Sequence, residues 1–377
     1  MFRNRILLAS LLKPVTDTRM YEKIGRSLLK LPEVEVHISG YVAPLPATTE
    51  NRLFLHPLFA FKRLSWQRVT AQLQYWRLLQ KVQPALLIVG THELLLVSWW
   101  YAVRTGAKII YDVRENYALN LSTQNIYKKG LGSLMAKIVR VIETFTSSRV
   151  QHFFLAEQSY AQELPFLGHK FSFLENKYLP SGNFPQPTRF FPVSLSKEQP
   201  LRFLYSGTIS RLYGTLEAVN FVEHIRQFLP QAELIIIGYC AEERFLEELR
   251  VRIQPLPFVK LIGGNKLVPH PQILEQERLC HVGLLPYQPH PSTFACIPTK
   301  LYEYAANGLV VIMQQNPLWD AILQRTHCGL PFDFRHSVTA AFIEQLLECT
   351  FYSEGVPKGI SWEEEEVHLL EVVRSLL

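Results

Sequence analysis

The sequence is poor in aspartate and cysteine, and it has no long hydrophobic run. Only four aspartates occur among its 377 residues, and no D-x-D motif exists to hold a metal-bound diphosphate. The five cysteines form no C-x2-C pair, which argues against a zinc site and predicts free thiols in a reducing compartment. The longest apolar stretch, 94–103, is too short to cross a bilayer, which takes about 20 residues. We therefore expect a soluble, cytoplasmic protein.

Motifs of several large protein classes are also missing. The sequence contains no G-x-x-x-x-G-K-[ST] loop and no G-x-S-x-G elbow, which argues against P-loop nucleotidases and α/β-hydrolases. It has no H-x-x-x-H pair, so no metal is expected. No arginine-rich arm or aromatic RNA-binding motif is present, and nucleic acid is not an expected partner. The apolar run 6–12 resembles a first strand more than a signal peptide.

Charge is distributed unevenly along the chain. Residues 1–180 hold 23 Lys and Arg against 12 Asp and Glu, whereas residues 181–377 hold 16 against 21. A basic first half predicts an anionic partner there, either a phosphate-bearing substrate or an anionic lipid. A solvated basic face is the alternative. Two segments, 59–66 and 127–140, mix cations with apolar residues and predict contact with a membrane surface, or else helices packed on their own sheet.

Short apolar runs alternate with helix-length segments, the pattern of an α/β protein with doubly wound parallel sheets. The segment 180–200 contains five prolines, so we predict a first domain over 1–182, a linker over 183–200, a second domain over 201–360 and a final helix over 361–377. We expect strands at 5–11, 34–39, 85–89, 108–111, 152–155, 171–174, 201–205, 233–237, 259–262, 282–285 and 309–313. We expect helices at 19–31, 66–81, 134–146, 214–228, 242–251, 271–278, 299–306 and 338–349.

The most informative segment is 297–312. Pro298 suits the first turn of a helix, and Gly308 suits its left-handed stop. Lys300 and Glu303 share one face near the helix N-terminus. Lys300 and the first N–H groups can hold phosphate oxygens, and Glu303 can accept two hydroxyls of a ribose. The alternative is a surface salt bridge on an ordinary helix.

Other candidates follow predicted strands. Gly207 allows close approach of a ligand to the backbone, Arg211 can neutralise a pyrophosphate, and Gly238 follows the next strand. These are ordinary turns in the alternative interpretation. In the first half, polar side chains after two strands are expected at the rim of a cleft, where a structural role is the alternative: His92, Glu93, Asp112, Arg114 and Glu115.

Taken together, these segments resemble the retaining GT-B glycosyltransferases of glycosyltransferase family 4 over nearly the whole chain. The pattern Pro298-x-Lys300-x-x-Glu303-Tyr304 is similar to the family's donor-site helix. Smaller segments resemble its other markers: 206–208, Gly238, 268–273, 283–287, 111–115, Asn176 and 361–363.

The resemblance implies two Rossmann-like domains facing across a cleft, with the last helix returning to the first domain. It implies retaining, metal-independent transfer of a sugar from a UDP- or GDP-sugar to a glycan or lipid-linked sugar, in surface polysaccharide synthesis. The first domain would bind the acceptor and contact the inner face of the membrane. The implied catalytic residues are Glu303, Arg114 and Lys300. Donor contacts would come from Gly207, Thr208, Arg211, Gly238, Tyr239, Val268, Pro298, Thr299, Lys300 and Glu303, and acceptor contacts from His92, Glu93, Asp112 and Glu115.

Three positions depart from the family pattern. Ala295 stands where the first of two glutamates is usual, Arg114 replaces a histidine, and Tyr213 replaces a lysine. These departures keep two alternatives open. One is a GT-B scaffold or regulator that binds nucleotide sugar without turnover, and the other is a nucleotide-sugar epimerase.

Overall fold

The computed structural model describes residues 4–48, 50–61, 65–123, 130–180 and 191–377. The chain forms two compact units, the first of Met1–Asn176 with Trp362–Leu377 and the second of Lys177–Ser361. Both are parallel, doubly wound α/β units, which confirms the predicted fold class. The last helix, α13 (Trp362–Leu376), belongs to the first unit, as the resemblance implied. Its Trp362 is buried and donates a hydrogen bond to Ser27 Oγ at 3.1 Å.

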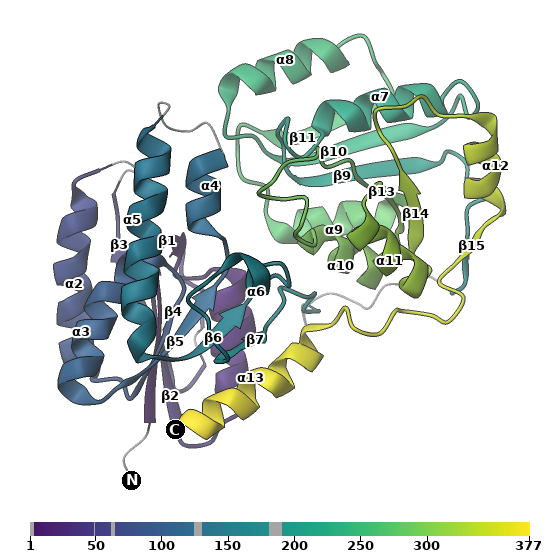
Figure 1. The fold of residues 1–377 in the computed structure, drawn as a ribbon. Coiled ribbons are helices and arrows are strands. Elements are labelled where there is room, and N and C mark those ends of the chain that lie inside the picture. Colours follow the sequence, from purple (N-terminus) through teal and green to yellow (C-terminus); the bar gives the residue numbers. More distant parts are fainter. Residues whose placement is uncertain (1–3, 49, 62–64, 124–129, 181–190) are drawn as a thin grey trace. The chain divides into compact units, whose positions relative to one another are not determined.

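Within the described residues of the first unit, seven parallel strands form a sheet in the order β3-β2-β1-β4-β5-β6-β7. The helices α2, α3 and α5 cover one face, while η1 and α13 lie on the other (Figure 1). The strands are β1 (Asn4–Pro14), β2 (Val34–Tyr41), β3 (Leu53–Phe59), β4 (Leu86–Val89), β5 (Lys108–Val113), β6 (Val150–Leu155) and β7 (Phe171–Phe173). The helices are η1 (Thr18–Gly25), α1 (Arg26–Leu28), α2 (Gln67–Val82), η2 (His92–Leu94), α3 (Leu95–Thr105), α4 (Tyr117–Thr123), α5 (Leu131–Thr146), η3 (Ser147–Arg149) and α6 (Tyr160–Glu163).

The described part of the second unit holds a six-stranded parallel sheet in the order β11-β10-β9-β12-β13-β14. Helices α7 and α8 lie on one face and α9, α10 and α11 on the other (Figure 1). The strands are β9 (Arg202–Thr208), β10 (Glu233–Tyr239), β11 (Val259–Gly264), β12 (Val282–Leu285), β13 (Val310–Gln314) and β14 (Gly329–Phe332). The helices are α7 (Thr215–Ile225), α8 (Glu243–Ile253), α9 (His270–Leu279), α10 (Thr299–Ala306), α11 (Pro317–Thr326) and α12 (Ala340–Glu348).

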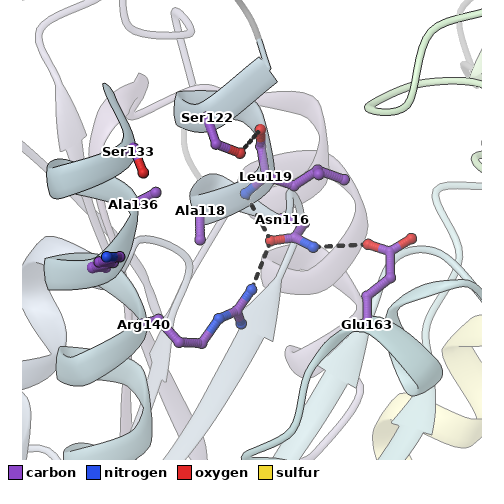
Figure 2. Close-up of a pocket in the computed structure, with 9 residues that line it drawn as sticks. Asn116, Ala118, Leu119, Ser122, Ser133, Ala136, Arg140 and Glu163 are labelled. Atoms are coloured by element: carbon purple, nitrogen blue, oxygen red, sulfur yellow. Dashed lines mark hydrogen bonds between the residues drawn. The ribbon is translucent and has the colours of Figure 1, made fainter. Parts of the chain in front are cut away.

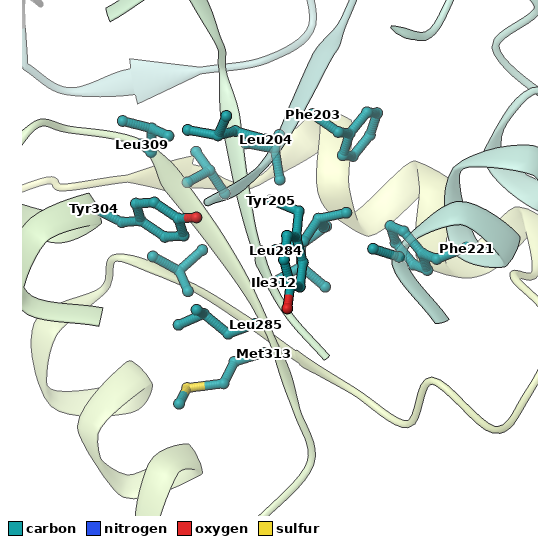
Figure 3. Packing of buried hydrophobic residues seen from close by; sticks show 14 of the residues in the cluster. Phe203, Leu204, Tyr205, Phe221, Leu284, Leu285, Tyr304, Leu309, Ile312 and Met313 are labelled. Carbon is teal, nitrogen blue, oxygen red and sulfur yellow. The ribbon is translucent and has the colours of Figure 1, made fainter. Parts of the chain in front are cut away.

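The core of the second unit explains why its central strands are almost wholly apolar. Both faces of the sheet are covered by helices, so strands such as β13 are buried along their whole length. Figure 3 shows Leu284 and Ile312 on one face of the sheet and Leu285 and Met313 on the other. This rigid sheet fixes the positions of the loops that follow its strands.

The predicted linker is only partly visible, because 181–190 lies outside the described residues. Its remainder, 191–200, belongs to the second unit and contains β8 (Val193–Ser194). That strand pairs antiparallel with β15 (Thr350–Phe351). The division between the units falls at Asn176 and Lys177, six residues before the predicted boundary.

Candidate functional site

Three glycines stand side by side where the parallel strands of the second unit end. The register pairs Gly207 of β9 with Gly238 of β10, and Gly238 with Gly263 of β11. A Cβ on Gly238 would lie 1.7 Å from the carbonyl oxygen of Gly207, and one on Gly263 would lie 2.4 Å from that of Gly238. Only glycine fits in this row, which therefore presents bare backbone at the carboxyl edge of the sheet.

The helix α10 brings its first turn to the same edge. A Cβ on Gly207 would lie 3.8 Å from Lys300 Cε, so the lysine stem passes directly beside the glycine. Pro298 is the N-cap of α10, and Gly308, with φ 70°, ends the turn that follows it, as the sequence predicted. The first N–H groups of α10 and the Lys300 side chain therefore lie beside the glycine row.

Tyr304 anchors α10 to the sheet. Its hydroxyl donates to Ser206 Oγ at 3.0 Å and accepts from the Ser206 backbone N at 2.9 Å. Its ring occupies the space above Gly283, where a Cβ would lie 2.3 Å from the ring. The position of Lys300 relative to Gly207 is therefore set by a buried, hydrogen-bonded ring.

Replacing Tyr304 by phenylalanine keeps the ring but leaves the buried Ser206 N–H without its acceptor. We expect the free energy of unfolding to fall by about 1–2 kcal/mol, measured as a lower denaturant midpoint at unchanged slope. Tyr239→Phe is the matched control, because Tyr239 is 38% exposed, and a change within about 0.5 kcal/mol is expected there. An equal loss in both variants would contradict the anchoring role.

A buried charge cluster lies along α10. Lys300 Nζ is 2.6 Å from Glu303 Oε1 and 3.4 Å from Glu277 Oε1, on α9. Asn307 Nδ2 donates to the other Glu277 oxygen at 2.8 Å, and His270 Nε2 lies 3.3 Å from Glu303 Oε1. Glu277 is fully buried, whereas Lys300 and Glu303 keep 14% and 15% of their side chains exposed. The last two are therefore the members that face outward.

The protonation states of this cluster follow from its geometry. Burial, and then the negative charge of Glu303, raise the pKa of Glu277 well above its ordinary value. Burial acts to raise the pKa of Glu303 as well, but the Lys300 ammonium and His270 outweigh it and hold the pKa low. Burial acts to lower the pKa of Lys300, and the two glutamates outweigh it. Burial and neighbouring charges therefore favour the charged forms of Lys300 and Glu303 and the neutral form of Glu277 beneath them.

Other predicted donor residues divide into two groups. Thr208 and Tyr239 are exposed and paired in register just beyond the glycine row, and Val268 packs against Gly263. Thr299 is exposed in the first turn of α10. Arg211 instead forms an ion pair with Glu248 of α8 and stacks over Phe245, 4.9 Å from the ring centroid. The structure therefore does not bring Arg211 to Lys300.

Two of the residues that depart from the family pattern, Ala295 and Tyr213, lie in the second unit. Ala295 is exposed in a turn eight residues before Glu303, and it offers no carboxylate. Tyr213 packs against Tyr287, with ring centroids 4.8 Å apart.

In the first unit, Asp112 is the centre of a buried ionic network. It is completely buried and accepts from Arg19 Nη2 at 2.6 Å and from Arg114 Nε at 2.8 Å. Arg114 also reaches Asp17, at 2.9 Å. Burial acts to raise the pKa of Asp112, but the two guanidinium groups outweigh it and lower the pKa. The carboxylate of Asp112 therefore faces its own arginines rather than the rim of a cleft.

His92, Glu93 and Glu115 lie near one another after β4 and β5. His92 packs against Tyr117, with ring centroids 4.7 Å apart, and burial lowers its pKa. Glu93 pairs with Arg68 at 3.1 Å, and Glu115 pairs with Lys13 at 3.1 Å. These side chains form a polar edge at the carboxyl ends of the first sheet.

A hollow of about 410 Å³ opens between α4, α5 and α6 in the first unit. Figure 2 shows Asn116 at its centre, accepting from Arg140 Nη2 at 3.0 Å and donating to Glu163 Oε2 at 2.8 Å. Lys137, Ser122 and Ser133 also line it. Its lining can hold a polyhydroxylated or anionic group. In the part of the chain that the structure describes, no three His, Cys, Asp or Glu side chains form a metal site.

Comparison with solved structures identifies the architecture. A sucrose-phosphate synthase from Thermosynechococcus elongatus superposes with a TM-score of 0.70 at 14% identity, covering 99% of each chain. HepE from Anabaena, in complex with UDP and glucose, gives 0.66 at 10% identity, covering 99% of this chain and 100% of HepE. A glycosyltransferase from Rickettsia africae gives 0.64 at 10% identity, covering 100% and 99%. The fold is GT-B. No family model matches the sequence, and no curated protein matches it either.

Glu277 and Asn116 are the polar residues of this GT-B chain that sequence reasoning missed. Glu277 lies three residues after the buried Leu274 on α9, so its place on the inward face was readable from helical spacing. A carboxyl group at such a position needs buried partners, here Lys300 and Asn307. Asn116 accepts from the Leu119 N at the start of α4, an ordinary capping signal that gives no hint of the hollow.

Proposed function

We propose that this protein is a metal-independent, retaining glycosyltransferase that uses a nucleotide sugar as its donor. The donor would lie on the second unit, with its ribose hydroxyls on Glu303 and its diphosphate on the glycine row. The observation that carries the proposal is the approach of Lys300 to Gly207, because it combines bare backbone with a fixed cation at one sheet edge. In an open α/β sheet, ligands bind at the carboxyl ends of the strands.

The proposed chemistry needs groups that stabilise a departing diphosphate. The bond between the anomeric carbon and the phosphate oxygen breaks as the acceptor hydroxyl attacks from the same face, and the leaving phosphate takes its proton. Lys300 and the first N–H groups of α10 would stabilise the developing negative charge. No protein nucleophile is needed, so Ala295 in place of a glutamate is compatible with turnover.

The donor class is proposed from one of the structural neighbours, and the acceptor class from polar features of the first unit. HepE is described with UDP, with UDP and glucose, and with UDP-glucose, which supports a UDP-sugar for this chain. We propose a glycan or lipid-linked sugar as acceptor, in surface polysaccharide synthesis. The hollow beside Asn116 and the polar edge at His92 and Glu115 are its candidate sites on the first unit, which would also contact the membrane.

A second candidate is a protein that binds a nucleotide sugar without turnover. Two observations favour it: Arg114 is held by Asp112 and Asp17, and Arg211 is held by Glu248. In this alternative the donor surface is kept and the catalytic contacts are lost.

The decisive experiment is a thermal-shift screen with UDP, GDP, ADP and their common sugars, with and without Mg²⁺. A ligand at 100 times its dissociation constant adds about 2.7 kcal/mol, so we expect the midpoint to rise by roughly 5–10 °C with one nucleotide, independently of Mg²⁺. Glu303→Ala should abolish the shift, whereas Glu247→Ala, at an exposed position of α8, should keep it. No shift with any nucleotide would overturn the proposal. A thermal shift with no release of nucleoside diphosphate from the nucleotide sugar, in the presence of glycan or lipid-linked acceptors, would favour the second candidate.

A further inference from the structure

The helices α2, α3 and α5 expose large apolar side chains on their outer surface, which we call the three-helix face. On α5 these residues follow a spacing of three and four, one stripe along the helix, and they are 49–67% exposed. Of the 24 exposed large apolar residues in the described ranges, eleven lie on this face. They are Trp66, at the cap of α2, with Val69, Leu73, Leu96, Trp100, Val103, Leu131, Leu134, Ile138, Val141 and Phe145.

The three helices form one continuous surface. Trp99 of α3 packs against Phe145 of α5, with ring centroids 4.9 Å apart. Arg104 of α3 lies over Trp100 at 4.4 Å and over Trp76 of α2 at 5.8 Å. Figure 1 shows α2, α3 and α5 in one layer on the same face of the sheet. An exposed apolar surface shared by three neighbouring helices indicates an interaction site.

The charge of this face is of one sign. The three helices carry six Lys and Arg and a single acidic residue, Glu143, which is buried. Arg68 and Arg140 pair with Glu93 and Glu143, at 3.1 and 3.2 Å. The other four cations are exposed: Arg77, Lys81, Arg104 and Lys137. An occupant with complementary charge must therefore be anionic as well as apolar.

We propose that the three-helix face docks the protein on an anionic lipid bilayer, with α5 lying flat at the interface. Apolar side chains would enter the headgroup region while the exposed cations attract lipid phosphates. None of the helices in the described ranges is long and apolar enough to cross a membrane. The link to a lipid-linked acceptor rests on the proposed function. Lipid binding itself is measured without donor or acceptor, so the lipid-binding proposal and the proposed function can fail independently.

The test is flotation of the full chain with vesicles of phosphatidylcholine alone and with 40% phosphatidylglycerol, at low and at high salt. We expect binding to the anionic vesicles that weakens at least tenfold in 0.5 M salt. The double variant I138E/V141E should lower the affinity at least tenfold, and K81E/K137E should lower it by about tenfold or more. These positions are exposed, so unchanged melting temperatures are expected.

The matched control is V251E/V367E, which places the same charges at positions 69% and 58% exposed on α8 and α13. It should bind as the unchanged chain does. Equal binding to both vesicle types, or equal loss in I138E/V141E and in the control, would overturn the proposal. So would sedimentation that shows a dimer dissociated by I138E/V141E without any vesicle binding, because the face would then pair two copies of this chain.

Discussion

Replacing Asp112 by alanine should lower the free energy of unfolding of the first unit by about 3–5 kcal/mol. Asp112 is completely buried between Arg19 and Arg114, whose side chains are only 5% and 8% exposed. Without the carboxylate, two guanidinium groups remain buried, and Arg114 keeps only Asp17. For a unit of this size the expected fall in melting temperature is roughly 10 °C, measured by calorimetry as a shift of the first unit's transition.

Glu115→Ala is the control in the same segment. Its ion pair with Lys13 has both side chains more than a third exposed, and we expect a loss below about 1 kcal/mol. The pH dependence provides a second check. The pKa of Asp112 is lowered, so its contribution is fully present above the unfolded pKa of about 4 and is lost as the pH falls through the folded value. If the difference in free energy of unfolding between the unchanged chain and Asp112→Ala stayed constant down to pH 2, that result would contradict the ionic network.

The sequence predicted the central strands, the two-unit organisation and one edge strand of each parallel sheet, but it missed the other edge strand of each. The missed strands of the two parallel sheets, β3 and β14, are edge strands, and both contain a proline (Pro57 and Pro331). Proline removes a ladder donor and weakens a strand pattern, so an edge strand of this kind is read as a loop. The helix α3 was missed because it is apolar on nearly every side, including its exposed Trp100, so it lacks a polar face.

The candidate site was predictable where its residues lie close together in the sequence. Lys300 and Glu303 share one helix turn, so their proximity follows from spacing alone. The row of Gly207, Gly238 and Gly263 depends on the register of three strands, and no short sequence window contains it. Arg211 was assigned to a diphosphate because it follows a strand, but a carboxylate 37 residues later, on α8, holds it in the structure. Long-range ion pairs of this kind leave no periodic signal.

Glu277→Gln is expected to fold as well as the unchanged chain at neutral pH, although it removes a carboxyl group from a buried ion cluster. The pKa of Glu277 is raised well above its ordinary value by burial and by Glu303, which favours its protonated form in the native state. Glutamine has the same shape and is also neutral, and its amide oxygen can still accept from Asn307 or Lys300. Glu277→Ala, in contrast, should lose about 2–4 kcal/mol, because it opens a cavity and leaves the Asn307 amide and Lys300 without that acceptor.

The sign of the pH effect separates a neutral Glu277 from an ionised one. With a raised folded pKa, the native state binds one proton more than the unfolded state once the pH exceeds about 4.3, so the stability of the unchanged chain falls with pH up to the folded value. Glutamine does not titrate. The stability of Glu277→Gln relative to the unchanged chain should therefore rise with pH from about 4.3 up to the folded pKa, by at most about 1.4 kcal/mol per pH unit. Urea unfolding at four pH values measures this slope. If Glu277 were instead the carboxylate partner of Lys300, glutamine would leave a buried ammonium with one partner fewer and lower the stability at pH 7 by several kcal/mol. That outcome would place a negative charge on Glu277 and overturn its assignment as the neutral member of the cluster.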